Sequence, residues 1–238
     1  MQLVSTVSAQ GASWGVLNGD TVVDHRAIDP ILPDTLAGFI ARCATQSGLQ
    51  AAVAAKAAGL SGLPLAQVQL APCIPQPGKI ICLGVNYVDH AKEGGNTVAD
   101  YPTLFLRCST SLLAHGAPMK VPRISDKLDY EAELAVVIGK EGRNIPQARA
   151  HEHIASYSIY NDASIREWQF HAKQIASGKN FEGTGPFGPW MVTADEIAPG
   201  RALKLETRLN GEVVQSSHTG HMIFDIPKLI NYASTIFT

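Results

Sequence analysis

Two glutamates separated by a single residue, Glu131 and Glu133, are well placed to do chemistry together. They precede Val136, Val137 and Ile138, which favour a β-strand, and we expect this strand to extend back through Glu133. Because side chains alternate across a strand, both carboxylates should lie on one face, where they repel each other unless a cation lies between them. Hard divalent cations prefer such oxygen ligands. The spacing therefore makes the two glutamates candidate metal ligands.

A third acidic residue, Asp162, follows a second predicted strand at residues 156–160. The end of a neighbouring strand could bring this carboxylate to the same ion. A plainer interpretation also exists, because glutamates at alternate positions can line the solvent-exposed face of an amphipathic strand. The spacing of these residues leaves both interpretations open.

A histidine and a glutamate, His90 and Glu93, are three positions apart in a segment predicted to be helical, residues 87–93. Their side chains can therefore meet. A carboxylate beside an imidazole orients the ring and raises its basicity, so the pair could take a proton from water. Gly94 and Gly95 would let this helix act as a lid over bound substrate. The alternative is a solvated pair on a helix surface.

The N-terminal segment, to about residue 70, is predicted to contain one hairpin and two helices. The hairpin covers residues 14–24, with its turn at Asn18-Gly19, and Asp34 is the expected N-cap of the first helix. The predicted helices are residues 34–43 and the alanine-rich stretch 50–58, and a proline-rich linker follows at residues 72–78.

The segment after the linker is rich in predicted strands and has few, short helices. A tight turn at Asn210-Gly211 predicts a second hairpin. Because strands and helices do not alternate regularly, the pattern indicates an α+β fold. The predicted strands are residues 79–84, 103–106, 132–138, 156–160, 190–193 and 203–209, and the predicted helices are residues 87–93, 147–154 and 165–169.

The composition is that of an ordinary globular protein. The 238 residues include 19 Lys and Arg and 21 Asp and Glu, and this near-balance gives no reason to expect a nucleic acid or an anionic membrane as partner. The four cysteines form no C-x-x-C pair, which favours reduced thiols over disulfides or a zinc site. Without a signal peptide or an apolar span of roughly 20 residues, a cytoplasmic location is expected.

Several ordered motifs resemble those of the fumarylacetoacetate hydrolase family, in its acylpyruvate hydrolase and 2-oxo acid branch. The similarity covers about residue 79 to the end of the chain. The matching stretches are an opening strand and H-A-x-E helix at 79–93, a metal-binding strand at 129–139, an N-D-x-S-x-R-x-x-Q motif at 161–169, a pocket lysine at Lys179 before residues 185–190, and a late hairpin at 210–215 followed by Thr219 and residues 222–224.

The resemblance implies a fold and a cofactor. The expected fold is a mixed β-sheet roll, residues 71–238, preceded by a small N-terminal α+β domain, residues 1–70, in a homodimer. The family's core usually continues with further strands, so a C-terminally incomplete catalytic domain is expected. The implied cofactor is Mg²⁺, with Mn²⁺ or Ca²⁺ as alternatives, held by Glu131, Glu133 and Asp162.

The resemblance also implies an activity. The expected reaction is hydrolytic cleavage of a C–C bond in an acylpyruvate or fumarylpyruvate, through an enolate chelated by the metal. His90, Glu93 and Lys179 are the expected catalytic residues, and Arg166 and Gln169 the expected substrate-binding residues. The alternatives are an isomerase, hydratase or decarboxylase of 2-oxo acids using the same metal site, or a binding protein without catalysis.

Further details of the sequence bear on this site. Arg107 stands where many family members have lysine, which keeps the charge but changes the geometry. Asp162 and Arg166 could form a simple i,i+4 pair. His218 and His221 are interpreted as surface residues rather than metal ligands.

Overall fold

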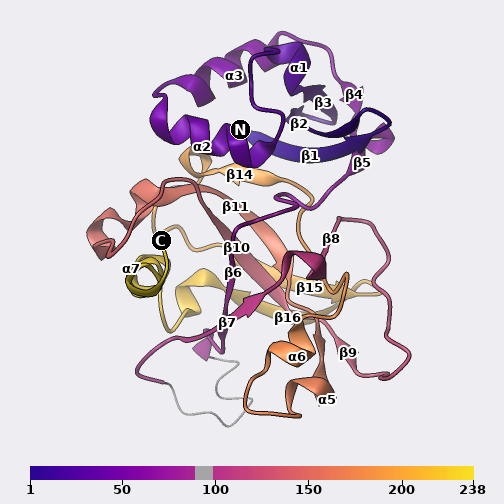
Figure 1. The fold of residues 1–238 in the computed structure, drawn as a ribbon, viewed down its shortest axis with the longest axis vertical. Coiled ribbons are helices and arrows are strands. Elements are labelled where there is room, and N and C mark those ends of the chain that lie inside the picture. The colour runs from indigo at the N-terminus through magenta and orange to yellow at the C-terminus, as the bar shows by residue number, and fades with distance from the viewer. Residues whose placement is uncertain (89–98) are drawn as a thin grey trace.

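A computed structural model describes residues 1–88 and 99–238 as a sheet-rich α+β structure, as expected (Figure 1). The predicted strands are present. The elements up to residue 70 are β1 (Gln2–Ser8), β2 (Gly11–Asn18), β3 (Thr21–Asp24), α1 (His25–Ile28), α2 (Leu36–Thr45), α3 (Leu49–Ala58), β4 (Leu63–Pro64), the 3₁₀ helix η1 (Leu65–Gln67) and β5 (Gln69–Leu70).

The elements that follow carry the predicted site. They are β6 (Ile80–Gly84), β7 (Thr103–Arg107), η2 (Ser109–Ser111), β8 (Leu112–Leu113), β9 (Leu128–Asp129), β10 (Ala132–Ile138), η3 (Gln147–His153), β11 (Ile154–Asn161), β12 (Ser164–Ile165), α5 (Arg166–Gln169), α6 (Ala176–Lys179), β13 (Gly185–Pro186), β14 (Met191–Thr193), η4 (Ala194–Glu196), β15 (Lys204–Leu209), β16 (Glu212–His218), η5 (Thr219–His221) and α7 (Ile226–Ile236).

The largest described sheet runs through both predicted segments. Its strand order is β10-β11-β14-β1-β2-β3-β4, with β5 also paired to β1. The junction is an antiparallel pairing of β1 with β14, in which Leu3 lies opposite Met191. One buried cluster likewise contains Trp14 and Phe39 from the first segment and Met191 from the second. The division at residue 70 is therefore crossed by both a sheet and a core, and it stays a prediction.

Three details of the N-terminal segment differ from the prediction. Strand β1 was not predicted at all, and the turn between β2 and β3 is Gly19-Asp20, because Asn18 already pairs with Thr21. Helix α2 is capped by Thr35, whose hydroxyl accepts a hydrogen bond from the Gly38 amide at 3.1 Å. The expected cap, Asp34, instead lies 3.6 Å from His25 Nε2.

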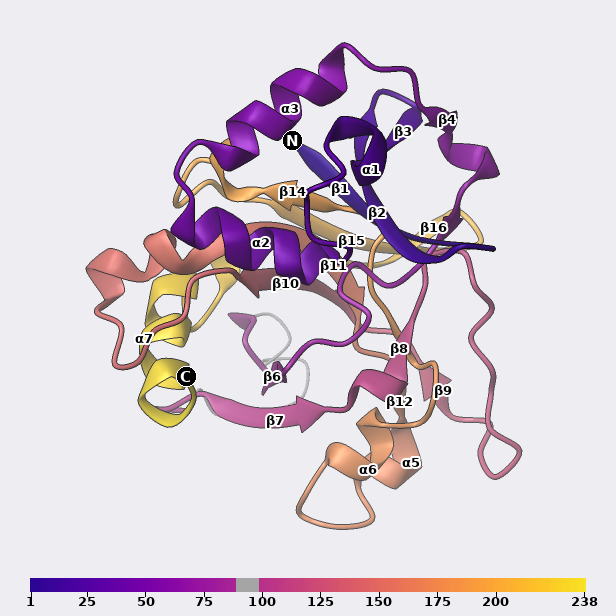
Figure 2. The same cartoon turned by 45° about the horizontal axis from the view of Figure 1, so that its top comes forward.

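The two faces of β10 pack against different parts of the chain. Ala135 and Val137 pack against the cluster shared with the N-terminal segment. Leu134 and Val136 pack against a second cluster that includes Ile230 of α7. Because side chains alternate, Glu133 lies on the face of Ala135 and Val137. The figures place α7 beside the sheet and the β6–β7 ladder outside it (Figures 1 and 2).

One helix predicted in this part has a different form, and another helix was missed. Residues 147–153 form a 3₁₀ helix, and α7, the longest described helix, was not predicted. Its beginning carries a recognisable signal, because the Asp225 side chain accepts from the Lys228 amide at 2.9 Å and Pro227 stands in the first turn. Within the described residues, no helix has both the length and the apolar character required to traverse a bilayer.

Candidate metal centre

The pairing of β10 with β11 brings two of the predicted ligands together. In this antiparallel register Ala132 lies opposite Asn161, so Glu131 just before β10 meets Asp162 just after β11. The Asp162 amide donates a hydrogen bond to the Glu131 carbonyl at 2.8 Å, and the Glu131 amide donates to the Asn161 side chain at 2.9 Å. Glu133 lies two residues further along the same strand, opposite Tyr160. Three carboxylates therefore converge at one end of the ladder.

A buried lysine joins two of these carboxylates. Lys179 Nζ lies 2.7 Å from Glu131 Oε2 and 2.7 Å from Asp162 Oδ2, and the side chain is only 3% exposed. Its ammonium also lies 5.4 Å from the centre of the Phe105 ring. The residue ends α6, which the sequence did not predict, but the family motif did single out the lysine itself. In this structure the lysine partly neutralises the acidic cluster.

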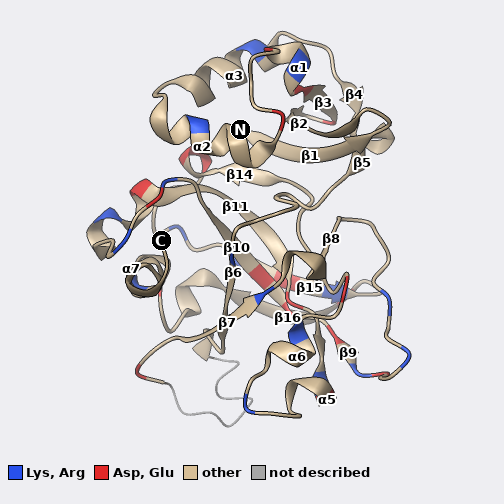
Figure 3. Ribbon diagram, viewed as in Figure 1, with Lys and Arg blue, Asp and Glu red and all other residues tan. Residues whose placement is uncertain are grey.

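A buried arginine forms the second cationic contact of Asp162. Arg107 Nη1 lies 2.5 Å from Asp162 Oδ1, and Nη2 donates to the Thr184 hydroxyl at 2.8 Å. The Arg107 side chain is fully buried on β7. Sequence reasoning noted the arginine only as a replacement for a common lysine and did not predict this pairing. Asp162 is thus held between Arg107 and Lys179, and acidic and basic stretches of ribbon gather where β7, β10 and α6 approach (Figure 3).

The arginine that was predicted, Arg166, contacts the cluster through Glu131. Arg166 Nη1 is 2.6 Å from Glu131 Oε1, and Nη2 is 2.8 Å from Asp129 Oδ2. The predicted i,i+4 pair with Asp162 was wrong, because helix α5 begins only at Arg166 and strand β12 separates the two residues. Gln169 accepts a hydrogen bond from Arg166 at 3.1 Å. Arg166 therefore positions Glu131, and Gln169 contacts Arg166.

Glu133 carries the charge that its neighbours do not neutralise. No hydrogen bond or ion pair joins its carboxyl to another described side chain, whereas Glu131 and Asp162 both have cationic partners. Burial, and then the nearby Glu131 and Asp162 carboxylates, raise the pKa of Glu133 to about 8, against a smaller opposing effect of Lys179. A carboxyl in this environment requires either a proton or a further cation.

The donor chemistry fits a hard divalent cation, since the cluster offers three carboxylates and one of them lacks a neutralising partner. The present geometry is different. Across residues 1–88 and 99–238, no three Asp, Glu, His or Cys side chains form a preformed cation site. Between Glu131 and Asp162, the space that a cation would need is occupied by the Lys179 ammonium. The structure shows a lysine-bridged form of the cluster.

The predicted base lies outside the described residues, as both His90 and Glu93 fall within residues 89–98. The late histidines are described. The ring centres of His218 and His221 lie 3.7 Å apart with their planes tilted by 43°, and His218 Nδ1 accepts a hydrogen bond from the Gly220 amide at 3.1 Å. The His90–Glu93 pair therefore stays a prediction.

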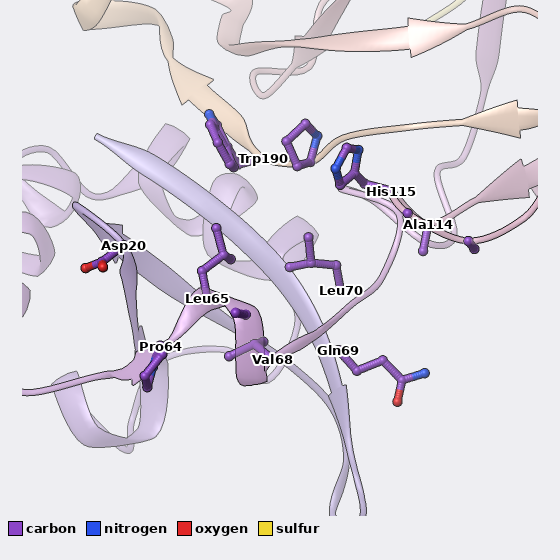
Figure 4. Close-up of a pocket in the computed structure, with 13 residues that line it drawn as sticks. Asp20, Pro64, Leu65, Val68, Gln69, Leu70, Ala114, His115 and Trp190 are labelled. Atoms are coloured by element: carbon purple, nitrogen blue, oxygen red, sulfur yellow. The ribbon is translucent and has the colours of Figure 1, made fainter. Parts of the chain in front are cut away.

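The described cavities lie away from the carboxylates. The larger one, about 780 Å³, lies between the N-terminal segment and the loop around residue 115. Leu65, Leu70, His115 and Trp190 line it (Figure 4). A second, about 400 Å³, lies between β10 and the start of α7, on the Leu134 side of the strand. Neither includes Glu131, Glu133 or Asp162, so charge and geometry, not cavity size, identify the candidate site.

Lys179→Met is expected to destabilise the metal-free protein while raising its affinity for Mn²⁺. Without the ammonium, the buried Glu131 and Asp162 carboxylates lose their shared partner, which costs about 3–5 kcal/mol when a buried pair is broken. The same change removes the cation that competes with a metal. Urea unfolding in EDTA and calorimetric titration with Mn²⁺ measure the two effects. Lys127→Met, at an exposed surface pair with Asp126, is the matched control. Unchanged stability in EDTA would contradict a bridging role.

Residues 79–238 match the family described as "Fumarylacetoacetate (FAA) hydrolase C-terminal". The human mitochondrial oxaloacetate tautomerase FAHD2A is 38% identical over 223 residues, which cover 93% of this chain and 70% of that protein.

Solved structures with this fold include enzymes of two further kinds. Maleylpyruvate hydrolase from Sphingobium sp. SYK-6, solved with manganese(II) and pyruvate, has a TM-score of 0.82 and 28% identity, covering 100% of this chain and 84% of that one. 2-Hydroxyhepta-2,4-diene-1,7-dioate isomerase from Mycobacterium marinum has a TM-score of 0.76 and 27% identity, covering 100% and 82%. The similar proteins thus include a tautomerase, a hydrolase and an isomerase.

Proposed function

The chain belongs to the fumarylacetoacetate hydrolase family, and from that premise we propose that it is a divalent-metal-dependent enzyme that interconverts the keto and enol forms of a small 2-oxo diacid such as oxaloacetate. The observation that carries the proposal is the convergence of Glu131, Glu133 and Asp162, with Glu133 left without a cationic partner. The 38% identity to an oxaloacetate tautomerase supports this choice among the family's reactions.

The same three carboxylates are the proposed metal ligands. A bound divalent cation would supply Lewis-acid polarisation of the two adjacent oxygens of a 2-oxo acid. We propose Mg²⁺ as the physiological ion, and Mn²⁺ as a substitute, since the similar maleylpyruvate hydrolase was solved with manganese. The predicted homodimer and cytoplasmic location stay predictions, and the human relative is described as mitochondrial.

The cationic side chains would hold the substrate's negative charge. Lys179 and Arg166 both contact Glu131, so either can turn toward a bound carboxylate or enolate oxygen once that contact is shared. Tautomerisation needs one proton to leave carbon 3 and one to reach the oxygen on carbon 2. We assign this transfer to His90, oriented by Glu93. Arg107 would keep Asp162 in place.

A second candidate is the hydrolysis of a C–C bond in an acylpyruvate. It is favoured by the fold shared with maleylpyruvate hydrolase, whose solved complex contains pyruvate. In this reaction the His90–Glu93 pair would activate water for attack on the distal carbonyl, and the C–C bond would break to release pyruvate as its enolate. The similar structures also include a 2-hydroxyhepta-2,4-diene-1,7-dioate isomerase.

One substrate panel separates these functions. Metal-free protein is loaded with Mg²⁺ or Mn²⁺ and mixed with the enol form of oxaloacetate, and loss of the enol's ultraviolet absorbance is followed. Acetylpyruvate, maleylpyruvate and fumarylpyruvate are tested in parallel for pyruvate release. We expect metal-dependent loss of the oxaloacetate enol without pyruvate release, and His90→Ala should abolish it while retaining Mn²⁺ binding. Pyruvate release from an acylpyruvate would establish the hydrolase instead, and inertness toward the whole panel would reject both.

A further inference from the structure

One buried phenol near the candidate metal centre has no described partner. Tyr87 is 9% exposed, and its hydroxyl makes no hydrogen bond to any residue that the structure describes. Burying a hydroxyl without a partner costs free energy, and native proteins rarely leave one unpaired. The hydroxyl is therefore available, among the described residues, to donate a hydrogen bond to a ligand.

The backbone around Tyr87 is held in a costly conformation. Val85, which follows β6, has φ = 53°, a left-handed conformation that is strained for a β-branched residue. The next residue fixes the strained turn through its side-chain amide. Asn86 Nδ2 donates to the Phe224 carbonyl at 3.0 Å, and the Phe224 amide donates to Asn86 Oδ1 at 2.9 Å. Strain that is held by such a clamp marks a position whose exact placement matters.

The hairpin β15–β16 links Tyr87 to the carboxylates. Tyr87 forms an antiparallel bridge with Met222, just beyond β16 and η5. In the same hairpin, Gln215 of β16 accepts a hydrogen bond from the Ala132 amide at 3.0 Å, between the two glutamates of the site. Through these two contacts, at Met222 and at Gln215, Tyr87 and the start of β10 both lie against the segment formed by β16 and η5. In agreement, burial and then the nearby Glu133 carboxyl raise the pKa of Tyr87 to about 12, so the phenol is a hydrogen-bond donor at neutral pH.

The Tyr160 hydroxyl is also buried, but Ser111 and the backbone at Gly185 surround it. The Tyr160 hydroxyl would lie 2.2 Å from a Cβ atom placed on Gly185, so the adjoining backbone packs directly against it. Tyr160 also belongs to the core cluster shared with the N-terminal segment. Its hydroxyl is enclosed by packing, whereas Tyr87 lies on the loop that adjoins Glu133.

We propose that the Tyr87 hydroxyl donates a hydrogen bond to an oxygen of a 2-oxo acid bound at the candidate metal centre. This bond would stabilise the enolate and orient it for proton transfer. The inference rests on the proposed function and adds to it a substrate-contacting residue from the end of β6.

The test is Tyr87→Phe, with oxalate as a planar mimic of an enolate. Oxalate binding to the Mn²⁺-loaded protein is measured by calorimetry, alongside Mn²⁺ affinity, oxaloacetate turnover and urea unfolding in EDTA. We expect oxalate affinity and turnover to fall about 10- to 100-fold, the usual effect of losing a hydrogen bond to a charged group. Mn²⁺ affinity should not change, and the stability of the metal-free variant should equal or exceed that of the wild type. The control is Tyr157→Phe. Tyr157 is a buried phenol of β11 that packs with Leu134 and Val136, on the face of the sheet away from Glu133, and its loss should leave every measurement unchanged.

Each other outcome overturns the inference. Unchanged oxalate affinity would show that the hydroxyl does not contact the ligand. Loss of Mn²⁺ affinity, or an unstable Tyr87→Phe variant, would show that the hydroxyl supports the ligands or the fold instead. A wild-type protein that binds neither Mn²⁺ nor oxalate would reject the proposed function itself. If the wild type and the Tyr87→Phe variant bind both equally well, only the inference about Tyr87 fails.

Discussion

Asp162→Asn is expected to abolish metal-dependent turnover, with a loss of about a thousandfold or more, and to destabilise the protein in the absence of metal. The carboxylate has two roles in the structure. It is a proposed metal ligand, and it pairs with both Arg107 and Lys179, which are almost completely buried. Removing its charge leaves two buried cations with one anionic contact fewer each. Losing one partner of a buried ion pair typically costs about 3–5 kcal/mol.

The measurements are turnover of oxaloacetate enol with Mn²⁺, Mn²⁺ titration, and urea unfolding in EDTA. Asp126→Asn provides the matched control, because Asp126 pairs with Lys127 on the surface and its side chain is 84% exposed. It should behave as the wild type in all three. Turnover within tenfold of the wild type would remove Asp162 from the metal's ligands. Unaltered stability in EDTA would mean that Arg107 and Lys179 find other partners.

Glu133→Gln is expected to remove the pH dependence of stability that the raised pKa of Glu133 imposes on the protein without metal. The pKa of Glu133 rises from about 4.5 to about 8 on folding. The folded state therefore retains a proton that the unfolded state releases, and stability is lost as the pH rises from below 4.5 through 8. The loss at this partly exposed group amounts to a few kcal/mol. The glutamine variant should show no such loss, so in EDTA at pH 8.5 it should be more stable than the wild type.

With metal present, the wild type is expected to be favoured over the glutamine variant. A divalent cation bound by Glu133 must displace the proton from its carboxyl. The affinity of the wild type for Mn²⁺ should rise with pH up to about 8 and then level off. The glutamine variant should bind Mn²⁺ weakly at every pH and lose turnover. Urea unfolding and Mn²⁺ titrations from pH 5.5 to about 9 measure both effects. The exposed Glu141→Gln is the control. A wild type whose stability in EDTA is flat across this range would contradict the raised pKa.

The Lys179 ammonium, a proton on Glu133 and a divalent cation compete for the same three carboxylates. In the structure Lys179 bridges Glu131 and Asp162, and the raised pKa of Glu133 favours a proton there that would relieve the remaining repulsion. A divalent cation would neutralise all three carboxylates at once and free the ammonium to face a substrate. Lys179→Met and Glu133→Gln remove the two competitors separately, so their effects on the metal-free protein should be opposite in sign.

The local sequence predicted the strands of the core well. Val136, Val137 and Ile138 lie in β10, and the stretches around residues 80–84 and 103–107 form β6 and β7. β-Branched and aromatic side chains pack well on a pleated, buried surface. Runs of them therefore predict strands whatever the rest of the fold. Helix ends were less predictable. Thr35 caps α2 in place of Asp34, whose carboxylate lies near His25 instead.

The sequence by itself determined which acids could meet, since the motifs and strand periodicity selected Glu131, Glu133 and Asp162 together with Lys179. Only the tertiary structure decided how their charges are paired. Arg107 reaches Asp162 from 55 positions away and Lys179 from 17, while Tyr87 adjoins Glu133 across a loop held by Asn86 and Phe224. Local periodicity fixes the face on which a side chain lies. The partner it finds depends on which distant element packs against that face, and this is set by the register and packing of the whole chain.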